Sequence, residues 1–413
     1  MRVLVFEDER TTRLYPVTIR RPAMAVTCGG YRLVDLVDRL GPTVRAAVRE
    51  YLRPTLADDW PDLLAPWPSR IEEPLLLVNA RLAPSVETIG RLADWAKAER
   101  PGVVHAEGSI AAALFPAGTP APAPLNSTTT AGWIAEQRLP QPAQVDLPLL
   151  QWPHDVVRSH LEVIGANLAD RLARDDYREV ADGVFAAPGA TLGQYTVADT
   201  RRGPVLLDRE STIGPFCYLE GPAYVGPRAR ILEHAAIKDG VCLGHTTKVG
   251  GEVEASVLEP LTNKQHHGFL GHSYLGSWVN LGAGTCNSDL KNTYGTVTMD
   301  YQGHKVGTAM QFVGCIMGDY AKTAINTSIF TGKTIGACSM VYGYVTTNVP
   351  SFVNYARQFG QVTEAPVEVM IATQARMFRR RGVEQRACDV ELLRAMYELT
   401  RHERQLANQP LTL

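Results

Sequence analysis

Aliphatic residues recur at every sixth position through the middle of the chain. Seven of them follow one another in a single register: Ile213, Leu219, Val225, Ile231, Ile237, Leu243 and Val249. An α-helix turns about 100° per residue, so residues six apart lie about 120° from one another around its axis and form no common face. A short strand followed by a corner, in contrast, turns one aliphatic side chain inward every six residues. The spacing therefore predicts a column of short strands.

The same period returns further along the chain, at Leu275, Leu281, Met317, Thr323, Ile329, Ile335 and Val341. Three such strands complete one coil, and stacked coils bury a continuous aliphatic core. We therefore predict a parallel β-helix of hexapeptide repeats over residues 181–350. A filled column has no room for a ligand, so a site must lie on its outer faces, in loops that leave the coil, or between subunits.

The register breaks twice, at GGEVEASVLEPLTNKQHHGF (250–269) and at CNSDLKNTYGTVTMDYQGHK (286–305). Both stretches are rich in polar and ionisable residues. Loops carried by a rigid scaffold are common places for binding and catalytic residues. We expect both stretches to be loops that leave the coil, and the site to lie near them.

The pattern changes on both sides of the repeat. Strand-like runs alternate with helical stretches such as 31–40 and 86–98, which predicts an α/β domain over residues 1–153. A linker helix over 154–180 is expected to lead into the β-helix. Apolar spacing within 351–413 predicts helices that pack across the end of the column and cover its exposed strand edges.

Composition excludes several classes of protein. The 413 residues carry a formal net charge of −2 and no basic stripe beyond Arg379–Arg381, which excludes nucleic acid as a partner. The seven cysteines are scattered without C-x-x-C spacing, which argues against disulfides and a zinc site. The acidic start and the lack of a long apolar run predict a cytoplasmic protein without a membrane partner.

Two adjacent histidines, His266 and His267, stand at the end of the first break. Histidine is the usual base where an amine attacks a thioester, because its pKa lies near neutrality. Backbone N–H groups in GAGT (282–285) are candidates for stabilising the oxyanion that forms in such a reaction. From the residues alone, a catalytic base and a pair of solvated loop histidines remain equally open.

The stretch QHHGFLGHSYLGSWVNLGAGTCNSD (265–289) resembles the bacterial bifunctional enzymes that join glucosamine-1-phosphate N-acetyltransferase to N-acetylglucosamine-1-phosphate uridyltransferase. Members of that family have a histidine four residues before L-G, then I-G and V-N-I-G-A-G-T. Here His266 stands four residues before Leu270-Gly271, ahead of VNLGAGT (279–285). Segments such as NSDLKN resemble a compact, sugar nucleotidyltransferase-like branch. The resemblance implies a left-handed β-helix, acetyl-CoA as co-substrate, a homotrimer, and His266 as general base.

The resemblance also implies roles for individual residues. Asn280 matches a contact to the amino-sugar phosphate, Ala283 a residue at the thioester, and Asn287 a residue near the acetyl group. Three further positions match coenzyme-binding strands: Ala324, Ile325 and Gly343.

Some positions depart from the family pattern. Phe269 replaces a tyrosine, and an arginine and a lysine that hold the sugar phosphate correspond to Leu232 and Gly250. These departures put the acceptor in doubt. Four lysines are candidates for the missing charge, with Lys264 and Lys291 taken as substrate-binding: Lys248, Lys264, Lys291 and Lys305. Each of them is otherwise expected to be a solvated surface lysine.

The N-terminal stretch VLVFEDERTTRLYPVT (3–18) resembles the first loop of sugar-1-phosphate nucleotidyltransferases through its T-R-L-x-P. Residues 7–11, EDERT, replace the glycines that let a backbone cradle a triphosphate. Asn79 stands where a metal-binding aspartate is expected. We therefore expect a degenerate nucleotidyltransferase-like domain, with Mg²⁺ involved only if that domain is active.

These observations predict an acetyl-CoA-dependent N-acetyltransferase that acts on an amino-sugar phosphate, with glucosamine-1-phosphate as the expected acceptor. A sugar-1-phosphate nucleotidyltransferase that uses UTP or dTTP is the first alternative, and release of pyrophosphate would identify it. A non-catalytic scaffold or sugar-nucleotide-binding protein is the second, favoured by the departures at Leu232 and Gly250.

Overall fold

The computed structural model describes residues 1–66, 70–120, 125–140 and 145–405. Parts of the proline- and alanine-rich stretch, 121–124 and 141–144, therefore lie outside the described residues. The chain divides into two compact units, one of residues 1–27 and 31–152 and the other of residues 28–30 and 153–413. Each unit is described by itself.

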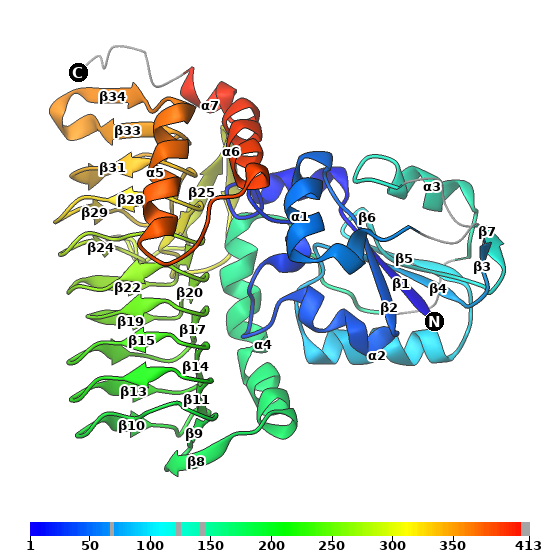
Figure 1. Ribbon diagram of the computed structural model, residues 1–413, viewed down its shortest axis with the longest axis horizontal. Helices are drawn as coiled ribbons and strands as arrows, with labels where there is room; N and C mark the ends of the chain where they lie inside the picture. Colours follow the sequence, from blue (N-terminus) through cyan, green and yellow to red (C-terminus); the bar gives the residue numbers. More distant parts are fainter. Residues whose placement is uncertain (67–69, 121–124, 141–144, 406–413) are drawn as a thin grey trace. The chain divides into compact units, whose positions relative to one another are not determined.

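The first unit is built on a five-stranded sheet in the order β2-β1-β4-β6-β5 (Figure 1). The strands are β1 (Arg2–Phe6), β2 (Thr43–Ala47), β4 (Leu75–Asn79), β5 (Gly102–Ala106) and β6 (Ser109–Phe115). β1 pairs in parallel with β2 and β4, whereas β6 runs antiparallel to β4 and β5. Helix α2 (Val86–Lys97) begins where the Ser85 hydroxyl accepts the Thr88 N–H. The expected α/β pattern is confirmed for this sheet and this helix.

The prediction of a helix over 31–40 is wrong. The structure has two short 3-10 turns there, η3 (Leu33–Asp35) and η4 (Val37–Leu40). The carboxylate of Asp35 accepts the backbone N–H of Arg32 at 2.9 Å, which closes a local turn in place of a continuous helix. The apolar side chains that suggested a helix are nonetheless buried.

The second unit is a parallel β-helix with three faces. One face contains β10 (Val197–Asp199), β13 (Tyr218–Glu220), β16 (Ala236–Ile237), β19 (Glu252–Glu254) and β22 (Phe269–Gly271), followed by β24 (Cys286–Asn287), β29 (Ser328–Ile329) and β32 (Tyr344–Val345). The second contains β9 (Val184–Ala186), β11 (Val205–Leu207), β14 (Ala223–Val225), β17 (Val241–Leu243), β20 (Val257–Leu258), β23 (Tyr274–Leu275), β27 (Cys315–Met317) and β30 (Lys333–Ile335). The third contains β12 (Thr212–Ile213), β15 (Arg230–Ile231), β18 (Lys248–Val249) and β21 (Asn263–Lys264), followed by β28 (Lys322–Thr323), β31 (Met340–Val341) and β33 (Val353–Ala356).

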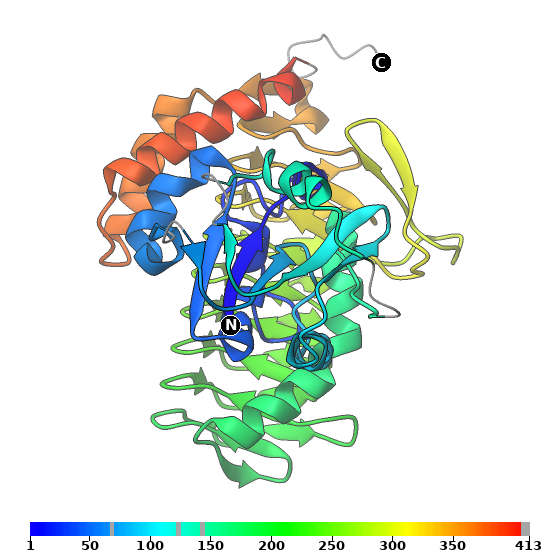
Figure 2. The same cartoon turned by 90° about the vertical axis from the view of Figure 1, so that its right-hand side faces the viewer.

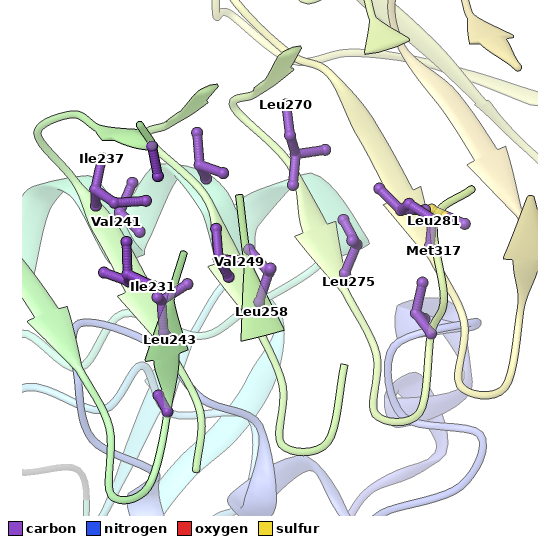
Figure 3. Packing of buried hydrophobic residues seen from close by; sticks show 14 of the residues in the cluster. Ile231, Ile237, Val241, Leu243, Val249, Leu258, Leu270, Leu275, Leu281 and Met317 are labelled. Carbon is purple, nitrogen blue, oxygen red and sulfur yellow. The ribbon is translucent and has the colours of Figure 1, made fainter. Parts of the chain in front are cut away.

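The aliphatic column is confirmed. Arg230 pairs with Lys248 one coil further along, a spacing of three hexads. The repeating aliphatic residues point into the column and pack on one another, as Figure 3 shows for ten labelled residues. Thr323 is the polar member of the series; it is buried, and its hydroxyl lies 2.7 Å from that of Thr285.

The first break in the register is not a loop, so that expectation is wrong. Residues 250–269 stay in the coil and form β19, β20, β21 and the start of β22. The coil is shorter there, since Lys248 pairs with Asn263, and Lys264 takes an inward position that the pattern reserves for an aliphatic residue. A shortened corner and a buried lysine together hid the repeat.

The second break does leave the coil. After β24 the chain forms an antiparallel hairpin of β25 (Thr298–Tyr301) and β26 (His304–Gly307), and it rejoins the coil at β27. Figure 2 shows this hairpin, in yellow, projecting from the stacked coils. The Tyr301 hydroxyl lies 2.8 Å from His154 Nδ1, which ties the hairpin to the start of α4.

Helices cover parts of the β-helix. α4 (Pro153–Arg174) ends four residues before β8 (Arg178–Ala181), an antiparallel partner of β9. The coil continues to β33, beyond the expected end at 350, and β34 (Gln361–Glu364) folds back antiparallel on it. None of the helices in the described part of the chain combines the length and apolarity of a membrane span.

The C-terminal helices take two positions. α5 (Val367–Arg379) lies beside the later coils in Figure 1, where Phe378 stacks on Trp278. α6 (Ala387–Leu399) packs near the end of the column, with the Tyr397 ring edge-on to Phe352. α7 (Arg401–Arg404) follows and pairs Arg404 with Glu364 of β34.

Candidate functional site

One edge of the β-helix gathers most of the residues that the sequence singled out. Here the chain turns from the third face to the first, at residues 265–268, 282–285, 324–327 and 342–343, which we call the His266 edge. Backbone hydrogen bonds join successive turns: Gly284 N–H donates to His267 O at 3.1 Å, and Asn326 N–H to Ala283 O at 2.7 Å. The stacking therefore brings together residues that lie up to 78 positions apart in the chain.

The His266 side chain is exposed at this edge. Among the described residues, no hydrogen bond or ion pair engages its ring. Gly268 allows the corner, because it has φ of 131° and a Cβ there would lie 2.1 Å from Thr285 O. The ring is thus free to approach a substrate, and its neighbour His267 is exposed as well.

Lys264 is buried directly below this corner, contrary to the solvated lysine expected. Its Nζ donates to Gly250 O at 2.7 Å and to His266 O at 3.0 Å. Burial lowers the pKa of the Lys264 ammonium to about 8. In this position Lys264 holds the backbone of His266 and presents no charge on the surface.

The GAGT turn leaves one N–H group available. Gly282 N–H donates to Thr323, Gly284 N–H to His267 O, and Thr285 N–H to Gly282 O. In the described part of the chain, the Ala283 N–H has no such acceptor. It lies one coil away from His266, about 4.8 Å along the stacking direction, and can therefore donate a hydrogen bond to an oxygen of a ligand bound at the same edge.

The two candidate asparagines have different environments. Asn280 is exposed, and its Oδ1 accepts from Asn263 Nδ2 at 3.3 Å. Asn287 is buried, and its side chain bonds both the N–H and the C=O of Gly271, at 2.8 and 3.0 Å. Asn287 therefore braces the coil, whereas Asn280 faces outward.

The remaining candidates are spread over neighbouring turns. Ile325 is 69% exposed on the turn above Ala283, next to Ala324. Gly343, with φ of 73°, lies on the following turn, and its C=O accepts the Ser328 N–H. Lys291 belongs to the excursion before the hairpin, where its Nζ donates to Thr296 O at 3.1 Å, outside the turns of the His266 edge.

The structure brings together a histidine–aspartate pair, His272 and Asp289, that was not predicted from the sequence. His272 Nδ1 lies 2.9 Å from the Asp289 carboxylate, and Phe312 stacks on the ring. His272 also helps to line a groove of about 350 Å³ beside α4, together with Arg202, Asp239 and other residues. The coil spacing was the available signal, because residues about 17 positions apart lie above one another. This groove lies at another edge, and none of the candidate site residues lines it.

The N-terminal turn is filled by internal ion pairs. Glu7 is fully buried; its carboxylate accepts from the guanidinium of Arg49 and from the backbone N–H groups of Ala23 and Arg49. The Asp8 carboxylate receives two hydrogen bonds from Arg81, at 2.8 and 2.7 Å, and one from Asn79 Nδ2 at 2.9 Å. Burial alone would raise the pKa of Asp8, but the hydrogen bonds and charge of Arg81 outweigh it and lower the pKa.

These residues do not fit Mg²⁺ or a nucleoside triphosphate. Asp8 and Asn79 bond to each other and to Arg81, and among the described residues no group of three His, Cys, Asp or Glu side chains is placed to hold a metal ion. The turn presents side chains already engaged inside the fold, where a phosphate would need open backbone N–H groups.

The chain is similar to known sugar-nucleotide enzymes. It matches the family described as sugar nucleotidyl transferase over residues 3–172. A bifunctional protein GlmU from Methanococcus vannielii is 29% identical over 119 residues, which cover 29% of this chain and 28% of that protein. A bifunctional protein GlmU from Bordetella parapertussis is 32% identical over 163 residues, 36% of this chain and 35% of that protein. These matches confirm the resemblance seen in the sequence.

A bifunctional sugar-1-phosphate nucleotidylyltransferase/acetyltransferase from Sulfurisphaera tokodaii is 28% identical over 34% of this chain and 36% of its own length. The chain thus matches about a third of the length of these relatives. Among solved structures, a UDP-N-acetylglucosamine acyltransferase from Francisella novicida is 15% identical, with a TM-score of 0.35, over 57% of this chain and 79% of that one.

Proposed function

We propose that this protein is an acetyl-CoA-dependent N-acetyltransferase that acts on an amino-sugar phosphate, with glucosamine-1-phosphate as the expected acceptor. His266 removes the proton from the amine as the nitrogen attacks the thioester carbonyl. Carbon–nitrogen bond formation and departure of the thiolate, which takes the proton from the His266 imidazolium, then give an amide and free coenzyme A. The relatives named bifunctional sugar-1-phosphate nucleotidylyltransferase/acetyltransferase support this reaction class.

The observation that carries the proposal is the pairing of an exposed imidazole with an available N–H on adjacent turns of one edge. His266 supplies the base, and the Ala283 N–H supplies a donor for the oxyanion. The C=O of His266 is fixed by Lys264, so the corner that carries the base is held in place. The proximity of a proton acceptor and a hydrogen-bond donor on adjacent turns supports the proposal.

The edge is open, and we propose that neighbouring copies complete it in a homotrimer. Ile325 and Tyr342 are exposed side chains on later turns of the His266 edge, and the exposed Tyr344 begins the adjoining strand β32. Contiguous exposed apolar groups commonly mark contact surfaces. The coenzyme would lie along the turns that carry Ala324, Ile325 and Gly343.

Thiol release from acetyl-CoA tests the proposal. The assay compares glucosamine-1-phosphate with glucosamine-6-phosphate, unphosphorylated glucosamine and no acceptor. We expect release that depends on a phosphorylated amino sugar. Absence of acceptor-dependent thiol with every one of these amines would contradict the proposed function.

A further inference from the structure

One face of the β-helix presents a row of hydrogen-bond donors without any acid. Adjacent strands and bridges align five outward positions on successive coils: Arg230, Lys248, Asn263, Asn280 and Lys322. Neighbouring strands lie about 4.8 Å apart, so these positions form a continuous ladder. At its last position the Lys322 Nζ donates to Tyr320 O at 2.9 Å. The row contains three cations and two amides, and no carboxylate interrupts it.

The turn that follows α5 adds an arginine, Arg381, to this row. Arg381 Nη2 donates to Asn263 Oδ1 at 2.6 Å. The helix end is fixed by two further contacts, the Phe378 ring on Trp278 at 4.6 Å between centroids and Gln374 Nε2 on the Tyr320 hydroxyl at 2.9 Å. Arg381 is thus placed on the row by packing of the helix.

In the part of the chain that the structure describes, these positive charges have no partner of opposite sign. Within the described residues, no ion pair joins Arg230, Lys248, Arg380 or Arg381 to a carboxylate. The pKa of Lys248 is lowered by burial and then by the charges of Arg381, Arg230 and Arg380. The pKa of Arg381 is lowered by burial and by Arg380. Like charges held together disfavour their charged forms, and a bound anion would relieve that repulsion.

We infer that Arg230, Lys248 and Arg381, with Asn263 between them, form a binding site for a phosphate group. Guanidinium and ammonium groups donate several charge-assisted hydrogen bonds to phosphate oxygens, and the asparagine amide orients the arginine. The site is a feature of this face of the column and does not depend on the reaction.

The source of the phosphate rests on the proposed function. Asn263 precedes His266 by three residues, a chain distance of at most about 10 Å. In glucosamine-1-phosphate the phosphate and the amine are on adjacent ring carbons, C1 and C2, whereas the pantetheine arm separates the phosphates of coenzyme A from the thioester. The position beside His266 therefore points to the phosphate of the acceptor.

Calorimetric titration of the full-length protein, without acetyl-CoA, tests the inference. The probes are inorganic phosphate, glucosamine-1-phosphate, glucosamine, coenzyme A and 3′-dephospho-coenzyme A. Lys248→Gln and Arg381→Gln are each expected to weaken the binding of glucosamine-1-phosphate about tenfold, because each variant loses a charge-assisted hydrogen bond. For the same reason, both variants should also bind inorganic phosphate more weakly. Lys248→Arg should restore most of the affinity. Arg178→Gln, at an exposed position on β8, is the matched control and should bind like the wild type.

Each outcome decides a different point. Unchanged affinity for inorganic phosphate and glucosamine-1-phosphate in both folded variants would overturn the anion site. If the two variants bind coenzyme A more weakly but bind 3′-dephospho-coenzyme A and glucosamine-1-phosphate like the wild type, the anion site stands. Its assignment to the acceptor phosphate would then be overturned. Because no turnover is measured, failure of the acetyl-transfer proposal would leave these results unaffected.

Discussion

Lys264 is a charged residue in a position that the repeat reserves for an aliphatic one. Its stem continues the column between Val249 and Leu281, while its Nζ bonds two carbonyl oxygens at the His266 edge. Long basic side chains commonly bury their methylene groups in this way. The burial explains both why the repeat was hard to follow here and how the corner before His266 is held.

The pH dependence of stability should report this lysine. Its pKa is about 8 in the folded protein and 10.5 ordinarily, so the unfolded chain binds more protons between these values and stability rises with pH across this window. Compared with Lys264→Met, the wild type should gain on the order of 3 kcal/mol in free energy of unfolding between pH 8 and pH 10.5. Urea unfolding at several pH values measures the difference, and a difference that stays constant with pH would contradict the assignment.

Individual residues also show where sequence reasoning reached its limit. The resemblance placed the expected cations at Leu232 and Gly250, whereas Arg230 and Lys248 stand two residues earlier on the same coils. Arg381 contacts Asn263 across 118 positions of the chain. That contact follows from the packing of α5, which no local pattern encodes.

At the scale of elements, α5 links the C-terminal tail to the face that carries the proposed phosphate site. Phe378→Ala should cost about 3 kcal/mol in the stability of this helix, because a buried ring that stacks on Trp278 is lost. Hydrogen exchange of the α5 amides measures that cost. The same variant should weaken phosphate binding, since Arg381 loses its anchor.

Phe359→Ala is the control for this experiment. Its ring is 67% exposed, and its loss should change stability by less than about 0.5 kcal/mol. Equal exchange rates of α5 in the two variants would show that the Phe378 stack does not hold the helix.

The repeat was predicted well because one interaction, aliphatic packing, determines it. Each inward position from Ile213 to Val249 contributes to one column, so the period survives in the sequence. The excursion after Asn287 was also recognised, since no aliphatic period runs through it. The 3-10 turns at 31–40 were not predicted, because the hydrogen bond that the Asp35 carboxylate accepts from the Arg32 N–H overrides the apolar spacing.

At the scale of the whole molecule, the two units differ in what their sites can do. In the first unit, the turn after β1 is occupied by Glu7–Arg49 and Asp8–Arg81. In the second, the His266 edge is open and carries an available N–H. The match to sugar nucleotidyl transferases over residues 3–172 thus includes a turn whose two carboxylates are already paired internally.

We therefore expect no nucleotidyl transfer. Incubation with UTP or dTTP, a sugar 1-phosphate and Mg²⁺ should release no pyrophosphate above the level of a no-enzyme control, because buried ion pairs fill the turn. A coupled pyrophosphate assay measures this. Pyrophosphate release at a rate comparable to that of thiol release from acetyl-CoA would show that the first unit is an active nucleotidyltransferase.

The central claim is that His266 is the general base, and a comparison of two neighbouring histidines tests it most directly. His266→Ala should lower acceptor-dependent thiol release by about 10²- to 10⁴-fold. His267→Ala removes another exposed ring one residue away and should retain activity within about threefold, since the family resemblance assigns the base to His266 and not to His267. Equal rates in the two variants, both close to the wild type, would contradict the account.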